Sequence, residues 1–352
     1  MEMLFKLADA LSEEKSDIPA GVNQELLLGQ IMINRIVSIA YDAVNHDTLH
    51  PEALKMLRII KDRNVEIYNQ FMNNLEFLTD ILKPADFNYA FLKGAYLAPF
   101  LYKAGHRTSN DIDILISSEN VSKLQRLLLS NNFIQGHIVS GKIVPASRKE
   151  IIESKMNFGE TVPFIRQMED NVLEVDINFS LDFKPSQDKQ IVSNMISRTI
   201  LVEKDQIRFR TLSLDDFLIH LCCHLYKEAT TYDWLQTRRD LLLYKFSDIN
   251  VYIHKHGGAD FFSGLVSRIK QLGLEKECYY TFENASIIYP HMNKFDSFIE
   301  TKESIMPSSL DFMTQILWPR ERKLLQHNMS FIDWFYCSDR VGQLEAIKHE
   351  AY

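Results

Sequence analysis

The chain has 352 residues, 46% of them apolar and 24% charged, which is enough for a sizeable core and for two domains of average size. Its 39 basic and 47 acidic residues give a net charge of −8. Because binding to a nucleic-acid backbone needs clustered Lys and Arg, this balance argues against nucleic acid as the main partner, although a local basic groove stays open.

The cysteines and the N-terminal residues indicate in which cellular compartment the protein is located. The four cysteines form no CxxC pair, and the stretch MEMLFKLADALSEEK is acidic where a signal peptide carries only positive charge. The most apolar early stretch, 26–44, is interrupted by polar residues. We therefore expect reduced thiols, a cytoplasmic location and no membrane insertion.

Helical periodicity dominates the N-terminal part of the chain. Between residues 20 and 82 apolar residues recur at intervals of three and four, and Pro51 is well placed to start a new helix. The Lys-Pro-Ala-Asp run at 83–86 ends this pattern. We expect a helical N-terminal region at 1–85.

Short β-like runs follow and alternate with two helical stretches, 94–102 and 121–129. The last two runs predict a ribbon that turns at Glu169-Asp170-Asn171. Together these elements predict a small mixed β-sheet with helices, within a core at 86–205. The predicted strands are 87–92, 112–116, 132–139, 162–168 and 172–179.

Helical periodicity returns from Leu212 to the end of the chain. Ser213 with Asp216 three residues later resembles a capping box that opens a helix through Lys227. We expect a helical C-terminal domain at 206–352. The fold class is then α+β, a small mixed sheet core with helical N-terminal and C-terminal regions.

Asp111 and Asp113 lie in the run Asp-Ile-Asp-Ile-Leu-Ile. On a strand, residues two apart point to the same face, about 6.6 Å apart along the chain. Two carboxylates held together are costly unless a cation lies between them. A divalent metal is the obvious candidate, and two Mg²⁺ ions about 3.5–4 Å apart suit phosphoryl or nucleotidyl transfer.

A third carboxylate lies in Leu-Glu-Val-Asp-Ile-Asn, where Glu174 and Asp176 share one face of the predicted strand. If this strand lies beside the first, Asp176 completes a triad with the Asp pair, and Glu174 is the competing third carboxylate. Upstream, Gly94 follows a strand and opens a helix. Its backbone amides, with Lys93 adjacent, could receive an anionic phosphate.

At these residues the chain resembles the nucleotidyltransferase superfamily that includes DNA polymerase β. More narrowly, Leu-Lys-Gly, Leu101-Tyr102, Arg107 and the Asp-x-Asp run resemble the uncharacterised bacterial nucleotidyltransferase family with a Lys-Gly turn. The likeness extends over about 87–322, through Asp216, His220, His224, Arg239-Asp240 and Trp318-Pro-Arg. Two features depart from it: Ala95 replaces the usual Gly or Ser, and the gap from Gly94 to Asp111 is long.

The resemblance implies a reaction and a set of roles. Asp111, Asp113 and Asp176 would be the catalytic residues and would bind Mg²⁺ or Mn²⁺. The nucleotide-binding residues would be Lys93, Gly94, Arg107, Ser109, His220 and His224. A nucleoside monophosphate would pass from an NTP to a hydroxyl or phosphate of a small molecule, peptide or protein, with release of pyrophosphate.

Simpler interpretations stay open for several of these residues. Lys93 could be a strand-end lysine in solvent, Arg107 could pair with Asp111 structurally, and Ser109 could serve only the turn. His220 and His224 could form a polar helix stripe, and they lack the Glu of an HExxH zinc site. The group Asp233, Arg239 and Asp240 is most simply a surface ion-pair set.

Two other functions stay open. The chain could be a non-catalytic relative that binds nucleotide or a partner through the same cleft. It could also be a toxin-like member that modifies tRNA or protein.

Overall fold

The structure, a computed structural model, describes residues 2–157, 159–169, 171–181 and 189–347. The chain divides into two compact units: unit 1 comprises 1–5, 33–35 and 218–352, and unit 2 comprises 6–32 and 36–217. The predicted regions 1–85, 86–205 and 206–352 stay a prediction about how the chain is organised.

The N-terminal segment is helical, as its periodicity predicts. α1 (Glu2–Leu7), α2 (Gln24–Ile33), α3 (Val37–Ala43) and a 3₁₀ turn, η1 (His46–Thr48), precede the long helix α4 (Pro51–Leu82). Pro51 is the first residue of α4, where its missing N–H costs nothing, and His50 Nδ1 accepts a hydrogen bond from Glu52 N–H at 3.4 Å.

An eight-stranded mixed sheet forms the centre of unit 2, in the order β4-β3-β5-β6-β2-β1-β8-β7. β6 and β2 are parallel, as are β1 and β8, and the other neighbouring strands are antiparallel. The predicted α+β class is therefore confirmed. The strands are β1 (Tyr89–Phe91), β2 (Asp111–Ile116), β3 (Ile134–Val139), β4 (Lys142–Pro145), β5 (Phe164–Gln167), β6 (Val172–Asn178), β7 (Ile200–Lys204) and β8 (Ile207–Thr211).

The sheet is larger than the sequence predicts. All five predicted strands are present, and β4, β7 and β8 are additional. Each of the three is only four or five residues long, which leaves little periodic signal. β5 and β6 form the predicted antiparallel ribbon, and Asp170 of its predicted turn lies outside the described residues.

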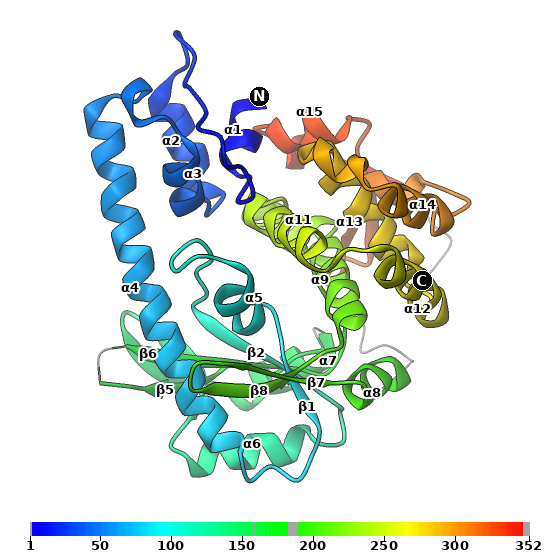
Figure 1. Ribbon diagram of the computed structural model, residues 1–352. Coiled ribbons are helices and arrows are strands. Elements are labelled where there is room, and N and C mark those ends of the chain that lie inside the picture. Colours follow the sequence, from blue (N-terminus) through cyan, green and yellow to red (C-terminus); the bar gives the residue numbers. More distant parts are fainter. Residues whose placement is uncertain (1, 158, 170, 182–188, 348–352) are drawn as a thin grey trace. The chain divides into compact units, whose positions relative to one another are not determined.

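The helices of unit 2 cover the apolar face of the sheet. Ile112 and Ile114 of β2 and Val175 of β6 are fully buried in a core with side chains of α4 and of α6 (Val121–Ser130). Figure 1 shows α6 below the strands and α5 (Gly94–Leu101) above them. Apolar residues at the helical spacing and apolar residues at every second strand position therefore pack in one core. The alternate residues of β2 and β6 point to the opposite face of the sheet. α7 (Arg148–Asn157) and α8 (Lys189–Ser197) complete the unit.

Unit 1 is mainly helical but also contains a small sheet. Strands β9 (Gln315–Trp318), β10 (Lys323–Gln326) and β11 (Glu345–Ala346) pair antiparallel in the order β11-β10-β9. The sequence predicts a helical C-terminal domain without these strands, because strands of two to four residues leave no periodic signal. The helices are α9 (Leu214–Ala229, which begins in unit 2), α10 (Tyr232–Gln236), α11 (Leu243–His256), α12 (Ala259–Leu272), α13 (Glu275–Ile288), α14 (Asp296–Ser304) and α15 (Phe331–Tyr336), with 3₁₀ turns η2 (Pro290–Lys294), η3 (Asp311–Thr314) and η4 (Val341–Gln343).

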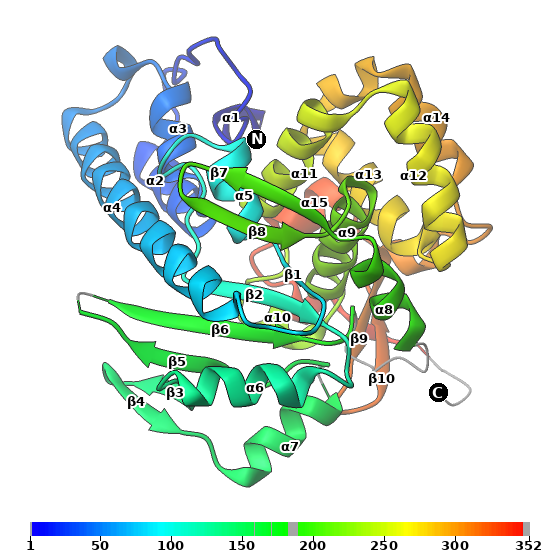
Figure 2. The ribbon, with the colours of Figure 1, turned by 60° about the horizontal axis from the view of Figure 1, so that its bottom comes forward.

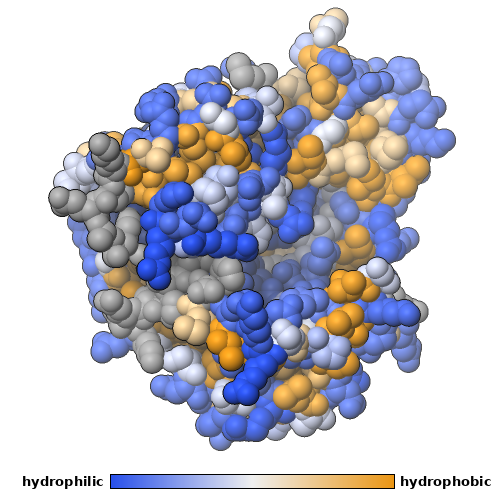
Figure 3. Space-filling model, turned by 180° about the vertical axis from the view of Figure 1, so that it is seen from behind, coloured by the Kyte–Doolittle hydropathy of each residue, from blue (hydrophilic) through white to orange (hydrophobic). Residues whose placement is uncertain are grey.

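The surface mixes polar and apolar side chains. On the face drawn in Figure 3, hydrophobic residues form small patches among hydrophilic ones. Within the described parts of the chain, no helix is both long and apolar enough to cross a membrane.

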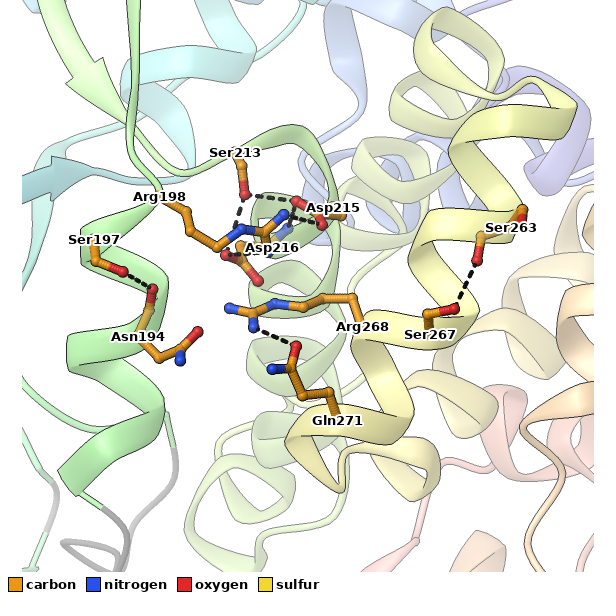
Figure 4. A network of polar contacts seen from close by, with 10 residues as sticks. All are labelled: Asn194, Ser197, Arg198, Ser213, Asp215, Asp216, Ser263, Ser267, Arg268 and Gln271. Carbon is orange, nitrogen blue, oxygen red and sulfur yellow. Dashed lines mark hydrogen bonds and ion pairs between the residues drawn. The ribbon is translucent and has the colours of Figure 1, made fainter.

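The start of α9 is held by a charged cluster in unit 2 (Figure 4). Arg198 reaches Asp215 at 2.6 Å and Asp216 at 3.0 Å, and the Ser213 hydroxyl donates to both carboxylates. Burial raises the pKa of Asp215, but hydrogen bonds from Ser213 and Arg198 outweigh this effect and bring the pKa below its usual value. The helix predicted from Ser213 and Asp216 is present, and its acidic first turn complements the helix dipole.

Candidate active site

Parallel pairing of β2 and β6 brings the predicted acidic residues together. Asp113 lies opposite Asp176, and Asp111 lies opposite Glu174. Neighbouring strands are about 4.8 Å apart, and residues in register point to the same face, so four carboxylates share one patch of the sheet. Figure 2 shows the two strands side by side. The two strands are neighbours, which is the condition under which Asp176 joins the Asp pair, while the catalytic roles of the residues stay a prediction.

The pKa values of Asp111, Glu174 and Asp176 are raised. Burial raises the pKa of Asp111, and the charge of Asp113 raises it further, against the opposing effects of Lys93 and Arg107. Burial, then the charges of Asp113 and Asp111, lifts the pKa of Asp176 well above its usual range. Burial also raises the pKa of Glu174, and the charge of Asp111 adds to this rise. The patch is thus short of positive charge.

The turn between β1 and α5 supplies a cation to this patch. Lys93 Nζ lies 2.8 Å from Asp113 Oδ1, and both side chains are largely buried. Gly94 follows, and a Cβ placed there would lie 2.5 Å from Ser109 Oγ and 2.7 Å from Ser109 Cβ. Only glycine therefore lets the start of α5 approach the loop that leads into β2. Lys93 is therefore not a strand-end lysine in solvent, the simpler interpretation of the sequence.

Ser109 and Arg107 lie in that same loop. Ser109 Oγ is 3.4 Å from Asp111 Oδ1 and 3.3 Å from the Asp111 carbonyl oxygen, so Ser109 helps to shape the turn into β2. Arg107 donates to the Thr108 carbonyl at 2.5 Å, and its charge acts on Asp111. Four predicted nucleotide-binding residues, Lys93, Gly94, Arg107 and Ser109, are thus close to the Asp pair in the chain's fold.

Two further residues at the patch were not predicted as part of the site. Asn178 donates from Nδ2 to Asp113 Oδ1 at 3.2 Å and so orients that carboxylate. Glu160 pairs with Asn178 as an isolated bridge, and its charge contributes to the raised pKa of Asp176. The alternation along β6 could have identified Asn178, whereas the sequence around Glu160 carries no strand signal.

His220 and His224 belong to unit 1, and their rings stack with centroids 6.5 Å apart. His224 Nε2 lies 3.5 Å from Glu228, which also binds Lys245. A role in nucleotide binding stays a prediction for both histidines. Nearby in the chain, Asp240 is completely buried and bonded to Arg340 at 2.6 Å, so its assignment to a surface ion-pair set is wrong.

The carboxylate patch offers donors of the kind that Mg²⁺ prefers. Its oxygens are hard ligands, and Asp176 Oδ1 is buried with no hydrogen-bond partner, as a metal-binding oxygen would be before its metal arrives. As the side chains stand in the described residues, no three His, Cys, Asp or Glu groups are arranged to hold a metal ion. The donor types fit Mg²⁺.

A helix that opens on a Lys-Gly turn, followed by a strand with Asp-x-Asp and a parallel neighbour with a third acid, defines a nucleotidyltransferase-type core. The chain belongs to the family described as uncharacterised nucleotidyltransferase, whose family model matches residues 20–290. That membership confirms the resemblance seen in the sequence and indicates transferase activity.

Comparison with solved structures gives a weak similarity. The chain is similar to the crystal structure of an antigenic nucleotidyltransferase-like protein from Paracoccidioides brasiliensis, with 12% sequence identity and a TM-score of 0.32. The similarity covers 56% of this chain and 86% of that chain. No match is found among curated proteins.

Proposed function

We propose that this protein is a metal-dependent nucleotidyltransferase that moves a nucleoside monophosphate from an NTP to an acceptor. The observation that carries the proposal is the register of β2 and β6, which sets Asp113 opposite Asp176 next to the Lys93-Gly94 turn. Acceptors would be hydroxyls or phosphates on a small molecule, a peptide or a protein. The family membership supports the reaction class.

The residues divide the chemistry between them. Asp111, Asp113 and Asp176 would hold Mg²⁺, which supplies charge neutralisation of the triphosphate and of the leaving pyrophosphate. The acceptor oxygen attacks the α-phosphorus, the bond between the α-phosphorus and the bridging oxygen breaks, and pyrophosphate leaves with its electron pair. Asp176 would help to activate the acceptor by holding the metal beside it, and the proton of an acceptor hydroxyl would leave to water.

Positioning would come from the turn and the loop. The start of α5 lies at the Lys93-Gly94 turn beside the patch, where the positive end of the helix favours a phosphate. Arg107 and Lys93 add positive charge on the same side, and Gly94 lets the backbone come close. Most of the rate enhancement would be electrostatic and positional.

The four cysteines support the expected location. Cys222, Cys223 and Cys278 are buried, Cys337 is partly exposed, and none of the four is in a disulfide. Free thiols are typical of reducing compartments, so we infer a cytoplasmic protein.

Incubation with each of the four NTPs, labelled at the α-phosphate, and whole-cell extract tests this function. We expect label to enter a small molecule, peptide or protein, pyrophosphate to accumulate, and EDTA to stop both. Asp113→Asn should reduce transfer at least about a thousandfold, as loss of a central charge does in such sites. Full activity of Asp113→Asn, or tight NTP binding with no transfer in any extract, would contradict the proposal. Label in RNA would instead indicate tRNA modification.

A further inference from the structure

Lys93 occupies a backbone conformation that ordinarily belongs to glycine. Its φ of 43° and ψ of −116° are those of the second residue of a type II′ turn, and Ala95 N–H donates to the Leu92 carbonyl at 3.1 Å to close that turn. Glycine is the residue favoured there, because a Cβ crowds the backbone at positive φ. The chain carries its glycine one position later, where Ser109 leaves no room for a side chain.

Strain of this kind persists where a side chain is needed at that point. The side chain of Lys93 turns into the carboxylate patch, is 18% exposed, and bonds to Asp113, whose side chain is 6% exposed. The same Asp113 oxygen also accepts from Asn178 at 3.2 Å. Asp113 Oδ1 is therefore already coordinated by two donors before any ligand binds.

This geometry conflicts with simple metal binding by Asp113. A carboxylate oxygen that is engaged by an ammonium group is blocked for a cation, and two positive charges at one oxygen repel each other. Lysine is a compact charge on a flexible four-carbon stem, so its Nζ can move several ångströms without a change in the backbone. A triphosphate at the start of α5 would give Nζ another anion to bind.

We propose that Lys93 is an internal counter-cation that occupies the metal position beside Asp113 and is exchanged for a divalent metal only when nucleotide binds. Nζ moves from Asp113 to the phosphates, and the freed carboxylate binds the metal that accompanies the NTP. Nucleotide and metal then bind with positive coupling, since each favours the same position of Lys93. This inference rests on the proposed function and adds an order to its binding steps.

Binding of Mn²⁺ alone, measured by electron paramagnetic resonance without nucleotide, tests the exchange. Lys93→Met should bind Mn²⁺ about tenfold more tightly than the wild type, because a competing charge is removed. Saturation with a non-hydrolysable NTP analogue should shrink that difference. Lys123→Met is the matched control, since it removes the exposed Lys123–Asp86 ion pair from the same unit and should leave Mn²⁺ affinity unchanged.

Lys93→Gly provides a second variant, because it also removes the ammonium group but relaxes the turn. Equal or weaker Mn²⁺ binding by both folded variants would overturn the inference. If label transfer occurs while Mn²⁺ affinity is unchanged in the variants, only the role of Lys93 falls. If both variants bind Mn²⁺ more tightly but the wild type transfers no label, the counter-cation stands and the proposed function falls.

Discussion

Buried charges are arranged differently in two clusters, one in each unit. In unit 1, each of two buried acids has its own base: Asp240 binds Arg340 at 2.6 Å, and Glu228 binds Lys245. In unit 2, Asp111, Asp113, Glu174 and Asp176 share one patch, and one lysine is bonded to one of them. A buried ion pair compensates the charge of its acid, whereas an excess of carboxylates is stable only with added cations. The contrast distinguishes paired acids from the proposed active site.

Breaking the buried Arg340–Asp240 ion pair should have the largest effect on stability. Arg340→Met leaves the Asp240 carboxylate buried without its base, so we expect the free energy of unfolding to fall by about 3–5 kcal/mol in urea titrations. Arg320→Met is the control, because the Arg320–Asp233 pair is exposed and should contribute about 0–1 kcal/mol. Equal effects of the two changes would remove the distinction between these pairs.

Acidification should weaken unit 1 through His327. Burial lowers the pKa of His327 to about 4, and its ring stacks on Trp334 at 3.8 Å. Because its folded pKa lies below its unfolded value of about 6.5, the unfolded state binds more protons within that window. The stability that the neutral ring contributes is complete above about pH 6.5 and is lost as pH falls toward 4, by about 2 kcal/mol or more.

His327→Gln should therefore flatten the pH dependence of the unfolding free energy between pH 6.5 and 4. His137→Gln is the control, since the His137 side chain is 45% exposed. The same slope in wild type and His327→Gln would show that other groups control the acid response.

The turn at Lys93 predicts a smaller difference between two variants that both lose the ion pair. Lys93→Gly should be more stable than Lys93→Ala by about 1 kcal/mol, because only glycine adopts a φ of 43° without a steric cost. Urea titrations of the two proteins measure this difference. A more stable alanine variant would mean that the backbone of Lys93 is not strained.

Part of this molecule could be predicted from the sequence. Alternation along the predicted strand placed Glu174 and Asp176 on one face, because a strand has a period of two, and in β6 these residues alternate with fully buried ones. Helical periods located α4 and α6 in the same way. Strands β4, β7, β8 and β9 were not predicted, since runs of four or five residues carry little periodic signal.

The site shows the same limit. The pair Asp111 and Asp113 can be recognised from the sequence. The register that sets Asp176 opposite Asp113 cannot, because it depends on the pairing of two strands whose residues lie 63 positions apart in the chain. Glu160 and the burial of Asp240 depend on tertiary contacts alone. Nor does a Lys-Gly sequence reveal that lysine takes the glycine-like conformation of the turn.

Asp176→Asn tests the central claim, that this patch trades stability for catalysis, when stability and transfer are measured on the same protein. We expect the free energy of unfolding to rise by about 1 kcal/mol, because a buried carboxylate with a raised pKa is removed, and label transfer to fall about a thousandfold. Glu174→Gln, the competing third carboxylate, should keep most of the transfer. Undiminished transfer by Asp176→Asn, or its loss only in Glu174→Gln, would contradict the account.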